Sequence, residues 1–458
     1  MTLSTNNISV VKMYFILTRL AIAVVLCKAS TSEEITFKNV TVEWVSDTGS
    51  NTTVVTSNSL KNNVPSGEEV SVNINGEVPI LYERSVSDIE NLKSLVLSAV
   101  GLEKIKPGAF FNLPVLEILI LSKNKLTELK SDTFRDLNVS TIDLSQNSIT
   151  SLQPGAFKNI NIRHLALSNN QIVEFPSGVF ENVTLGSLHL YNTHLKTIAP
   201  KALATTSLSS LVLSENKLEE IDPEAFDMPE LTSLSLDFNS IKHLRAGDLK
   251  NLPQLNTLDL VANKLEEVPE GVFNNSKITH LKLNFNKIAT IASKAFDDMS
   301  KISVLHFDHN NLTQWDNNWL GGTSNPDYVM AGFNQFSEIP DEAFKNYPKL
   351  YSIDLQGNKI MKISPKAFHK LERVVNFSLR DNEIDSWGPD WLVGVSIGTI
   401  DLSGNKLKCI DGDLDDIFKN NDFVQLEDNP WDTECAEKIK DFTTRKEKAP
   451  KTRSYVPN

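Results

Sequence analysis

The stretch "LEILILSKNKL", from Leu116 to Leu126, sets the pattern for most of the chain. Its leucines at 116, 119, 121 and 126 fit neither the helical period nor strict strand alternation. The spacing predicts a short strand in which Leu119 and Leu121 face the core, followed by a turn at Asn124. We expect the Asn124 amide to satisfy backbone groups that this turn would otherwise bury unpaired.

The Asn124 position, which we call a slot, recurs along the chain. Fourteen slots, separated by 23 or 24 residues, run from position 100 to position 405. Val100 and Thr193 fill two of them. The remaining slots hold asparagine at 124, 147, 170, 216, 239, 263, 286, 310, 334, 358, 382 and 405. A motif of this form with a period of about 20 to 29 residues is the leucine-rich-repeat signature.

The sequence therefore resembles the leucine-rich-repeat family. The resemblance implies an α/β fold: a right-handed leucine-rich-repeat solenoid (horseshoe) with a parallel concave β-sheet. Short helical turns and loops are expected on the convex side, where Phe or Leu stands ten residues after each slot, as at Phe134 and Phe157. We expect these residues to form an aromatic spine. Pro or Gly often precedes them, which favours single turns over long helices.

The ends of a solenoid need caps, because a terminal repeat exposes an apolar face. Residues 30–90 lack cysteine, and "EITFKNVTVEWV" and "EVSVNINGEVPIL" alternate as strands do. They predict a β-rich N-terminal cap, with a poorly ordered arm as the alternative. The solenoid of about 14 repeats is expected over 91–408, a C-terminal cap over 409–442, and a charged flexible tail over 443–458.

The segment "NPWDTEC" resembles the cysteine-bearing C-terminal cap of extracellular leucine-rich-repeat proteins. That family shows two cysteines separated by one residue, and here Thr433 stands where the first would be. What the resemblance implies is one bridge, between Cys409 and Cys435. Closing this loop would contribute about 3 kcal/mol by the loop-entropy estimate.

The N-terminus predicts export from the cell. Lys12 precedes the apolar run "MYFILTRLAIAVVLC", so residues 1–29 resemble a cleaved signal peptide. Met13 as the start, or a membrane anchor, are alternatives. No later segment has the roughly 20 apolar residues of a membrane span. A secreted, extracellular glycoprotein is expected, with N-x-S/T acceptor triplets at Asn39, Asn51, Asn138, Asn182, Asn274, Asn311 and Asn376.

Specificity is expected at the outward positions of the concave strands, six, four, two and one residues before each slot. The early repeats carry similar serines there, and the middle and late repeats are more diverse. The candidate ligand-binding residues are Asp237, Asp259, His280, Lys282, Asn284, His306, Asp308, Tyr328 and Met330.

Three features of this region leave alternatives open. Phe238, Phe285 and Phe333 stand directly before their slots, as exposed binding anchors or as local core beside the asparagines. His280, His306, His309 and Asp308 have the chemistry of metal ligands, but we expect a surface histidine patch and no metal site. The irregular repeat "WDNNWLGGTSNPDYVMAGFN" marks either a binding site or a local change of curvature.

The sequence favours recognition over catalysis. The net charge of −13 argues against a nucleic-acid partner, and no G-x-S-x-G, H-E-x-x-H or phosphate-binding glycine loop occurs. We expect no enzyme activity and no cofactor. Fourteen strands would give an inner surface about 65 Å long, which suits a protein partner or an extended microbial or matrix polymer.

The resemblance extends to Toll-like receptor ectodomains, Slit-type guidance proteins and insect leucine-rich immune proteins of a type without a coiled coil. It implies a secreted recognition protein in innate immunity. The alternatives are a matrix or cell-adhesion component, and an inhibitor or carrier subunit that clamps an enzyme. A monomer is expected.

Overall fold

The computed structural model describes residues 35–448, apart from residues 205, 275, 298 and 320–325. The predicted signal peptide and the end of the predicted tail lie outside the described residues. The chain forms two units. Unit 1 runs to Lys217 and includes Glu224–Leu231, and unit 2 comprises Leu218–Pro223 and the chain from Thr232 onward.

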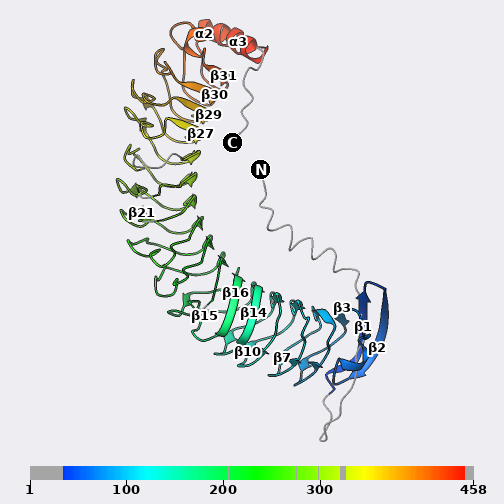
Figure 1. Ribbon diagram of the computed structural model, residues 1–458. Coiled ribbons are helices and arrows are strands. Elements are labelled where there is room, and N and C mark those ends of the chain that lie inside the picture. The colour runs from blue at the N-terminus through cyan, green and yellow to red at the C-terminus, as the bar shows by residue number, and fades with distance from the viewer. Residues whose placement is uncertain (1–34, 205, 275, 298, 320–325, 449–458) are drawn as a thin grey trace. The chain divides into compact units, whose positions relative to one another are not determined.

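Unit 1 begins with a cap of three strands (Figure 1). Strand β1 (Phe37–Ser46) pairs antiparallel with β2 (Gly49–Ser57) and with β3 (Val70–Asn75). Strand β3 then pairs parallel with β6 (Leu92–Val96), so the cap covers the edge of the first repeat. The alternation seen in the sequence buries one face of these strands. The predicted β-strand cap is confirmed, and the alternative of an unordered arm is wrong for these strands.

Each repeat contributes one strand to a parallel sheet. In unit 1 the series after β6 is β9 (Ile118–Ile120), β12 (Thr141–Asp143), β14 (Phe157–Ala166), β16 (Phe180–His189) and β18 (Ser210–Val212). In unit 2 it is β19 (Ser233–Ser235), β20 (Thr257–Asp259), β22 (His280–Lys282), β24 (Val304–His306), β25 (Tyr328–Met330), β27 (Lys349–Asp354), β29 (Arg373–Ser378), β30 (Ser396–Asp401) and β31 (Asn421–Gln425).

The returning side of the repeats carries short strands. In unit 1 these are β4 (Ile80–Leu81), β5 (Val86–Ser87), β7 (Lys104–Ile105), β8 (Phe110–Phe111), β10 (Glu128–Leu129), β11 (Phe134–Arg135), β13 (Ser151–Leu152), β15 (Glu174–Phe175) and β17 (Thr197–Ile198). In unit 2 they are β21 (Glu267–Val268), β23 (Thr290–Ile291), β26 (Glu338–Ile339) and β28 (Lys362–Ile363).

Helices are rare in this fold. Besides the 3₁₀ turn η1 (Lys61–Asn63), the described residues hold only α2 (Leu414–Ile417) and α3 (Thr433–Lys448). The expected helical turns of the repeats are isolated hydrogen-bonded turns, such as the one in which the Asp297 N–H donates to the Lys294 carbonyl. The chain therefore folds as a leucine-rich-repeat β-solenoid, with η1 in the N-terminal cap and both α-helices in the C-terminal cap.

The slot asparagines tie neighbouring repeats together, as predicted. In unit 2, the Asn310 Oδ1 accepts a 2.9 Å hydrogen bond from the Ile288 N–H of the preceding repeat. Its Nδ2 donates to the Leu283 carbonyl of that repeat and to the Phe307 carbonyl of its own. The Asn147 side chain makes the same three contacts in unit 1. The pattern extends to Asn429, a slot that the sequence analysis missed.

The spine is also confirmed within each unit. Phe134 stacks against Phe157 with ring centroids 5.1 Å apart, and in unit 2 Phe344 stacks against Phe368 at 6.1 Å. In the irregular repeat, the indole N–H of Trp319 donates to the Ile291 carbonyl, and Trp319 is buried. This tryptophan therefore belongs to the core.

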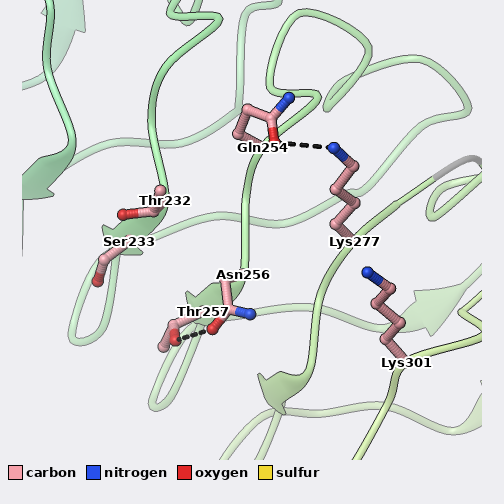
Figure 2. Close-up of a pocket in the computed structure, with 7 residues that line it drawn as sticks. All are labelled: Thr232, Ser233, Gln254, Asn256, Thr257, Lys277 and Lys301. Atoms are coloured by element: carbon pink, nitrogen blue, oxygen red, sulfur yellow. Dashed lines mark hydrogen bonds between the residues drawn. The ribbon is translucent and has the colours of Figure 1, made fainter.

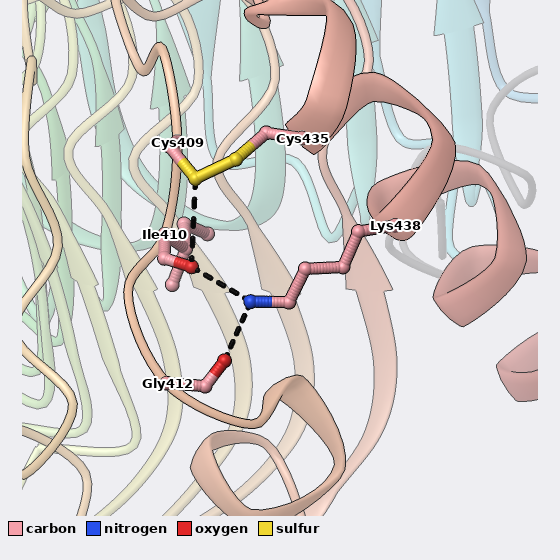
Figure 3. The surroundings of a disulfide bond; sticks show 5 residues. All are labelled: Cys409, Ile410, Gly412, Cys435 and Lys438. Carbon is pink, nitrogen blue, oxygen red and sulfur yellow. Dashed lines mark hydrogen bonds between the residues drawn. A yellow bond between two sulfur atoms is a disulfide. The ribbon is translucent and has the colours of Figure 1, made fainter.

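The C-terminal cap is closed by the predicted disulfide. Cys409 and Cys435 are bonded, with their Cα atoms 5.4 Å apart. Figure 3 shows the Lys438 ammonium beside the bridge, where it donates to the carbonyls of Ile410 and Gly412. Helix α3 continues beyond residue 442, the predicted end of the cap. The buried Phe442 packs against Phe418, with ring centroids 5.7 Å apart.

Candidate binding face

The outward side chains of the strands in unit 2 form one surface, which we call the sheet face. It consists of the residues six, four, two and one positions before each slot from Asn239 to Asn429. All nine predicted ligand-binding residues lie on it, because strand register keeps each position in line from one repeat to the next. Whether they bind a ligand stays a prediction.

One row of the sheet face combines charges and a histidine. Register aligns Asp259, Lys282, His306 and Met330 on four consecutive strands. The Lys282 Nζ lies 2.6 Å from the Asp259 carboxylate, so these two charges neutralise each other. Burial, with Lys282 as a second cause, lowers the pKa of His306. Tyr328, beside this row, packs against Tyr351 with ring centroids 5.0 Å apart.

Two carboxyl groups of the sheet face are held in poorly solvated positions. Burial raises the pKa of Asp308 and of Asp354 above the usual value of 3.8. Among the described residues, none donates a hydrogen bond to the buried Oδ1 of Asp308 or of Asn284. Buried acceptors normally have a donor. Because both oxygens are buried, a bound molecule does not reach them in this conformation.

The histidines do not form a metal site within the described residues. The His280 Nδ1 lies 2.7 Å from the Thr279 hydroxyl, and the His306 Nδ1 lies 3.8 Å from Asp308. His309 faces two phenylalanines. The described chain contains no group of three or more His, Cys, Asp or Glu side chains placed to hold a metal ion.

Three aromatic side chains form a continuous stack on the sheet face. Phe285 lies 4.1 Å from His309, and His309 lies 4.3 Å from Phe333, with the rings within 10° of parallel. Phe285 and Phe333 are 52% and 43% exposed, and the separate Phe238 is 56% exposed. The core alternative is therefore wrong for these phenylalanines. Gly357 lies at the end of the stack. A Cβ atom at this position would lie 2.6 Å from the Phe333 ring, so only glycine leaves room for the ring.

The stack occupies unfavourable backbone positions. Residues directly before the slots have positive φ, including Phe285 (56°), His309 (53°) and Phe333 (52°). This region favours glycine, asparagine, aspartate and histidine, but the residue before every slot adopts it, including Ala99, Lys123 and Glu215. The conformation is therefore imposed by the repeat itself and is not specific to the stack. About half of each phenylalanine side chain remains exposed, so the stack offers an apolar surface on the sheet face.

The sheet face is also acidic. Its rows contain eight carboxylates and two cations, Lys282 and Arg380. Both cations are paired, Lys282 with Asp259 and Arg380 with Asp381. The acidic residues are Asp237, Asp259, Asp308, Asp354, Asp381, Asp401, Glu427 and Asp428. The excess of carboxylates gives this surface a negative charge.

The sequence analysis omitted Phe285, His309 and Phe333 from its nine candidates. The residue type directly before the slot could have identified these three residues as candidates, since a bulky ring is disfavoured at a position with positive φ. The seven asparagines of the acceptor triplets are all exposed, and their glycosylation stays a prediction.

Comparison with known proteins identifies the repeat. The family model described as "Leucine rich repeat" matches residues 90–147, 138–195, 206–265, 229–287, 253–312, 332–384 and 348–407. The chain belongs to the leucine-rich-repeat family. This match names no catalytic family.

Curated relatives within this family match over short segments. The chain is 32% identical over 91 residues to leucine-rich repeat-containing G-protein coupled receptor 4 of Mus musculus, covering 19% of this chain and 10% of the receptor. It is 26% identical over 120 residues to osteomodulin of Rattus norvegicus, covering 26% of this chain and 27% of osteomodulin. The chain thus spans a small part of these relatives' lengths.

Solved structures of leucine-rich-repeat proteins show the same fold. A leucine-rich-repeat protein of Leptospira interrogans aligns with a TM-score of 0.55 and 22% identity, covering 78% of this chain and 95% of that one. A chain of the Drosophila Toll–Spatzle complex aligns with a TM-score of 0.56 and 22% identity, covering 78% of this chain and 50% of that one. In the part of the chain that the structure describes, no helix is long and apolar enough to cross a membrane.

Proposed function

We propose that this is a secreted recognition protein that binds a basic protein partner through the sheet face of unit 2, with a role in innate immunity. The observation that carries the proposal is the exposed stack of Phe285, His309 and Phe333. Aromatic residues dominate the energetics of many interfaces, and Phe285 and Phe333 remain 52% and 43% exposed in a continuous stack on the sheet face. No catalytic role or cofactor is proposed.

The acidic surroundings of the stack support a basic partner. A positively charged side chain could pair with Asp308 or Asp354 beside the rings. The excess of carboxylates would also speed the encounter through long-range attraction, an effect that falls as salt rises.

The setting of the function follows from resemblance. The disulfide-bonded cap fits an oxidising, extracellular environment. The immune role is carried over from the insect leucine-rich immune proteins and from the Toll–Spatzle complex, described as a hub in Drosophila development and innate immunity. An immune effector is therefore the expected partner.

The test begins with capture of partners from the extracellular fluid of the source organism by the tagged protein, followed by mass spectrometry. The affinity of each captured protein is then measured for the wild type and for the double variant Phe285→Ala/Phe333→Ala. If the two rings form a hot spot of about 2 kcal/mol, the double variant should bind its partner about 30-fold more weakly. The control is Phe111→Ala, which removes a 44% exposed phenylalanine on β8 in unit 1.

A second variant tests the charge on the sheet face. Reversal of Asp237, Asp259 and Asp308 to lysine should slow association and remove most of its salt dependence. Unchanged affinity in both multiple variants would exclude the sheet face of unit 2 as the site. A matrix protein or a single hydrolase as the captured partner would replace the immune role with one of the alternatives.

A further inference from the structure

A polar hollow lies at the edge of unit 2 where the sheet strands begin. It has a volume of about 410 Å³ and is lined by residues just before or at the start of β19, β20, β22 and β24. The lining residues are Thr232, Ser233, Gln254, Asn256, Thr257, Lys277 and Lys301, and none of them is acidic. The residues of the aromatic stack take no part in it.

The two lysines bring positive charge to one side of this hollow. They occupy the same position, nine residues before the slots Asn286 and Asn310, so they project from neighbouring repeats. Figure 2 shows both ammonium groups extending toward the hydroxyl-bearing strands. The Lys277 Nζ donates a 2.8 Å hydrogen bond to the Gln254 amide oxygen. This bond holds the ammonium group beside the hollow and leaves the other ammonium hydrogens for a ligand.

An amide completes the set of donors. The Asn256 Oδ1 accepts hydrogen bonds from the hydroxyls of Thr257 (3.4 Å) and Thr279 (3.1 Å). This orients the Nδ2 group as a donor, and Figure 2 shows it on the side of the lysines. Two ammonium groups and an amide N–H group around one space suit an oxyanion. None of the residues that line the hollow is acidic, so no lining carboxylate repels a bound anion.

The hollow has room for a ligand larger than an ion. A water molecule takes about 30 Å³ in the liquid, so a single sulfate or phosphate would fill only a small part of 410 Å³. The hydroxyls of Ser233 and Thr257 and the amide of Gln254 offer both donors and acceptors. These groups match the hydroxyls of a sugar.

We propose that this hollow binds a sugar unit that bears a sulfate or phosphate ester. Lys277, Lys301 and the Asn256 Nδ2 hold the ester oxygens, and the hydroxyls of Ser233 and Thr257 bind the ring. The site does not depend on the proposed function, because it uses none of the aromatic stack and none of the carboxylates of the sheet face.

The test compares glucose 6-sulfate, glucose 6-phosphate and glucose as ligands of the full chain, by NMR line-shape or calorimetric titration. Both esters are expected to bind. Glucose should bind about tenfold or more weakly than the esters, because it lacks the two charge-assisted contacts to the lysines. The tighter ester identifies the natural oxyanion. Binding of the esters should weaken as salt rises, because the lysines are exposed.

The variant Lys277→Gln/Lys301→Gln should reduce ester affinity about tenfold or more, with glucose unaffected. The matched control is Lys264→Gln/Lys287→Gln, which removes two exposed lysines one residue after adjacent slots and should keep ester affinity within twofold. Circular dichroism melts check that both variants fold. Esters that bind no better than glucose, or equal losses in the two variants, would overturn the proposal.

Discussion

At the scale of the residue, the slot asparagine is the most constrained side chain of the repeat. Its amide uses both donors and its acceptor on backbone groups of two consecutive repeats, as Asn310 shows. Threonine can take the slot at 193 because its hydroxyl still donates to the Leu190 carbonyl. A side chain without polar atoms leaves these buried groups unpaired.

The substitution Asn310→Ala is therefore expected to lower the free energy of unfolding by about 1–3 kcal/mol. The Ile288 N–H and the Leu283 carbonyl would lose the partners they now have. Urea titration followed by circular dichroism measures the change. The exposed Asn420→Ala is the control, with an expected change within about 0.5 kcal/mol. Similar losses in both variants would contradict the structural role of the slot.

Asp308 illustrates a residue that reduces stability. Burial raises the pKa of its carboxyl, so the folded state holds the proton more strongly than the unfolded state does. Stability then decreases as pH rises from the usual value of 3.8 through the raised folded pKa, and the full penalty remains at neutral pH. A carboxylate kept in such a position is consistent with a role in binding.

Asp308→Asn should accordingly increase the free energy of unfolding at pH 7 and flatten its decrease with rising pH. Denaturant unfolding at a series of pH values from 4 to 7 measures both effects. The same variant should weaken capture of a basic partner. A less stable variant at pH 7 would show that the carboxylate makes a favourable interaction that outweighs its desolvation.

At the scale of the element, the sequence predicted strands better than helices. Leucine spacing and the slot specified β9, β12 and their successors, because each apolar position has a fixed place in the repeat. The extent of α3 could not be predicted, since its last turns are held by contacts distant in sequence. The Lys446 ammonium donates to the carbonyls of Phe418 and Asn421. The helix thus continues where composition suggested a flexible tail.

The disulfide joins α3 to the last turns of the solenoid. Cys435→Ser is expected to lower the free energy of unfolding by about 3 kcal/mol, from the loop entropy released in the unfolded chain. Unfolding of the oxidised wild type and of the variant provides the measurement. Wild-type protein unfolded in reductant should match the variant. A loss in the variant that reductant does not reproduce would assign the effect to packing of the buried Cys435 side chain instead.

At the scale of the whole molecule, periodicity determines what the sequence can and cannot predict. Core positions recur every 23 or 24 residues, so one repeat informs on all others. The sheet face lacks such redundancy. The exposure of Phe285 and Phe333 depends on backbone conformation and on the size of neighbouring side chains, notably Gly357. Patterns of apolar residues carry no information on these contacts, so the stack was left open and His309 was assigned to a histidine patch.

Because each repeat bonds only to its neighbours in the ladder, damage should remain local. The Asn147 amide contacts its own repeat and the preceding one. Hydrogen exchange of Asn147→Ala is therefore expected to accelerate in β9, β12 and β14, with amides of β27, β29 and β30 unchanged. Asn358→Ala should give the opposite distribution, because its amide bonds to the Phe336 N–H and the Ala331 carbonyl in unit 2. Uniform acceleration in both variants would mean that the chain opens as one cooperative body, and the nearest-neighbour description of its stability would be wrong.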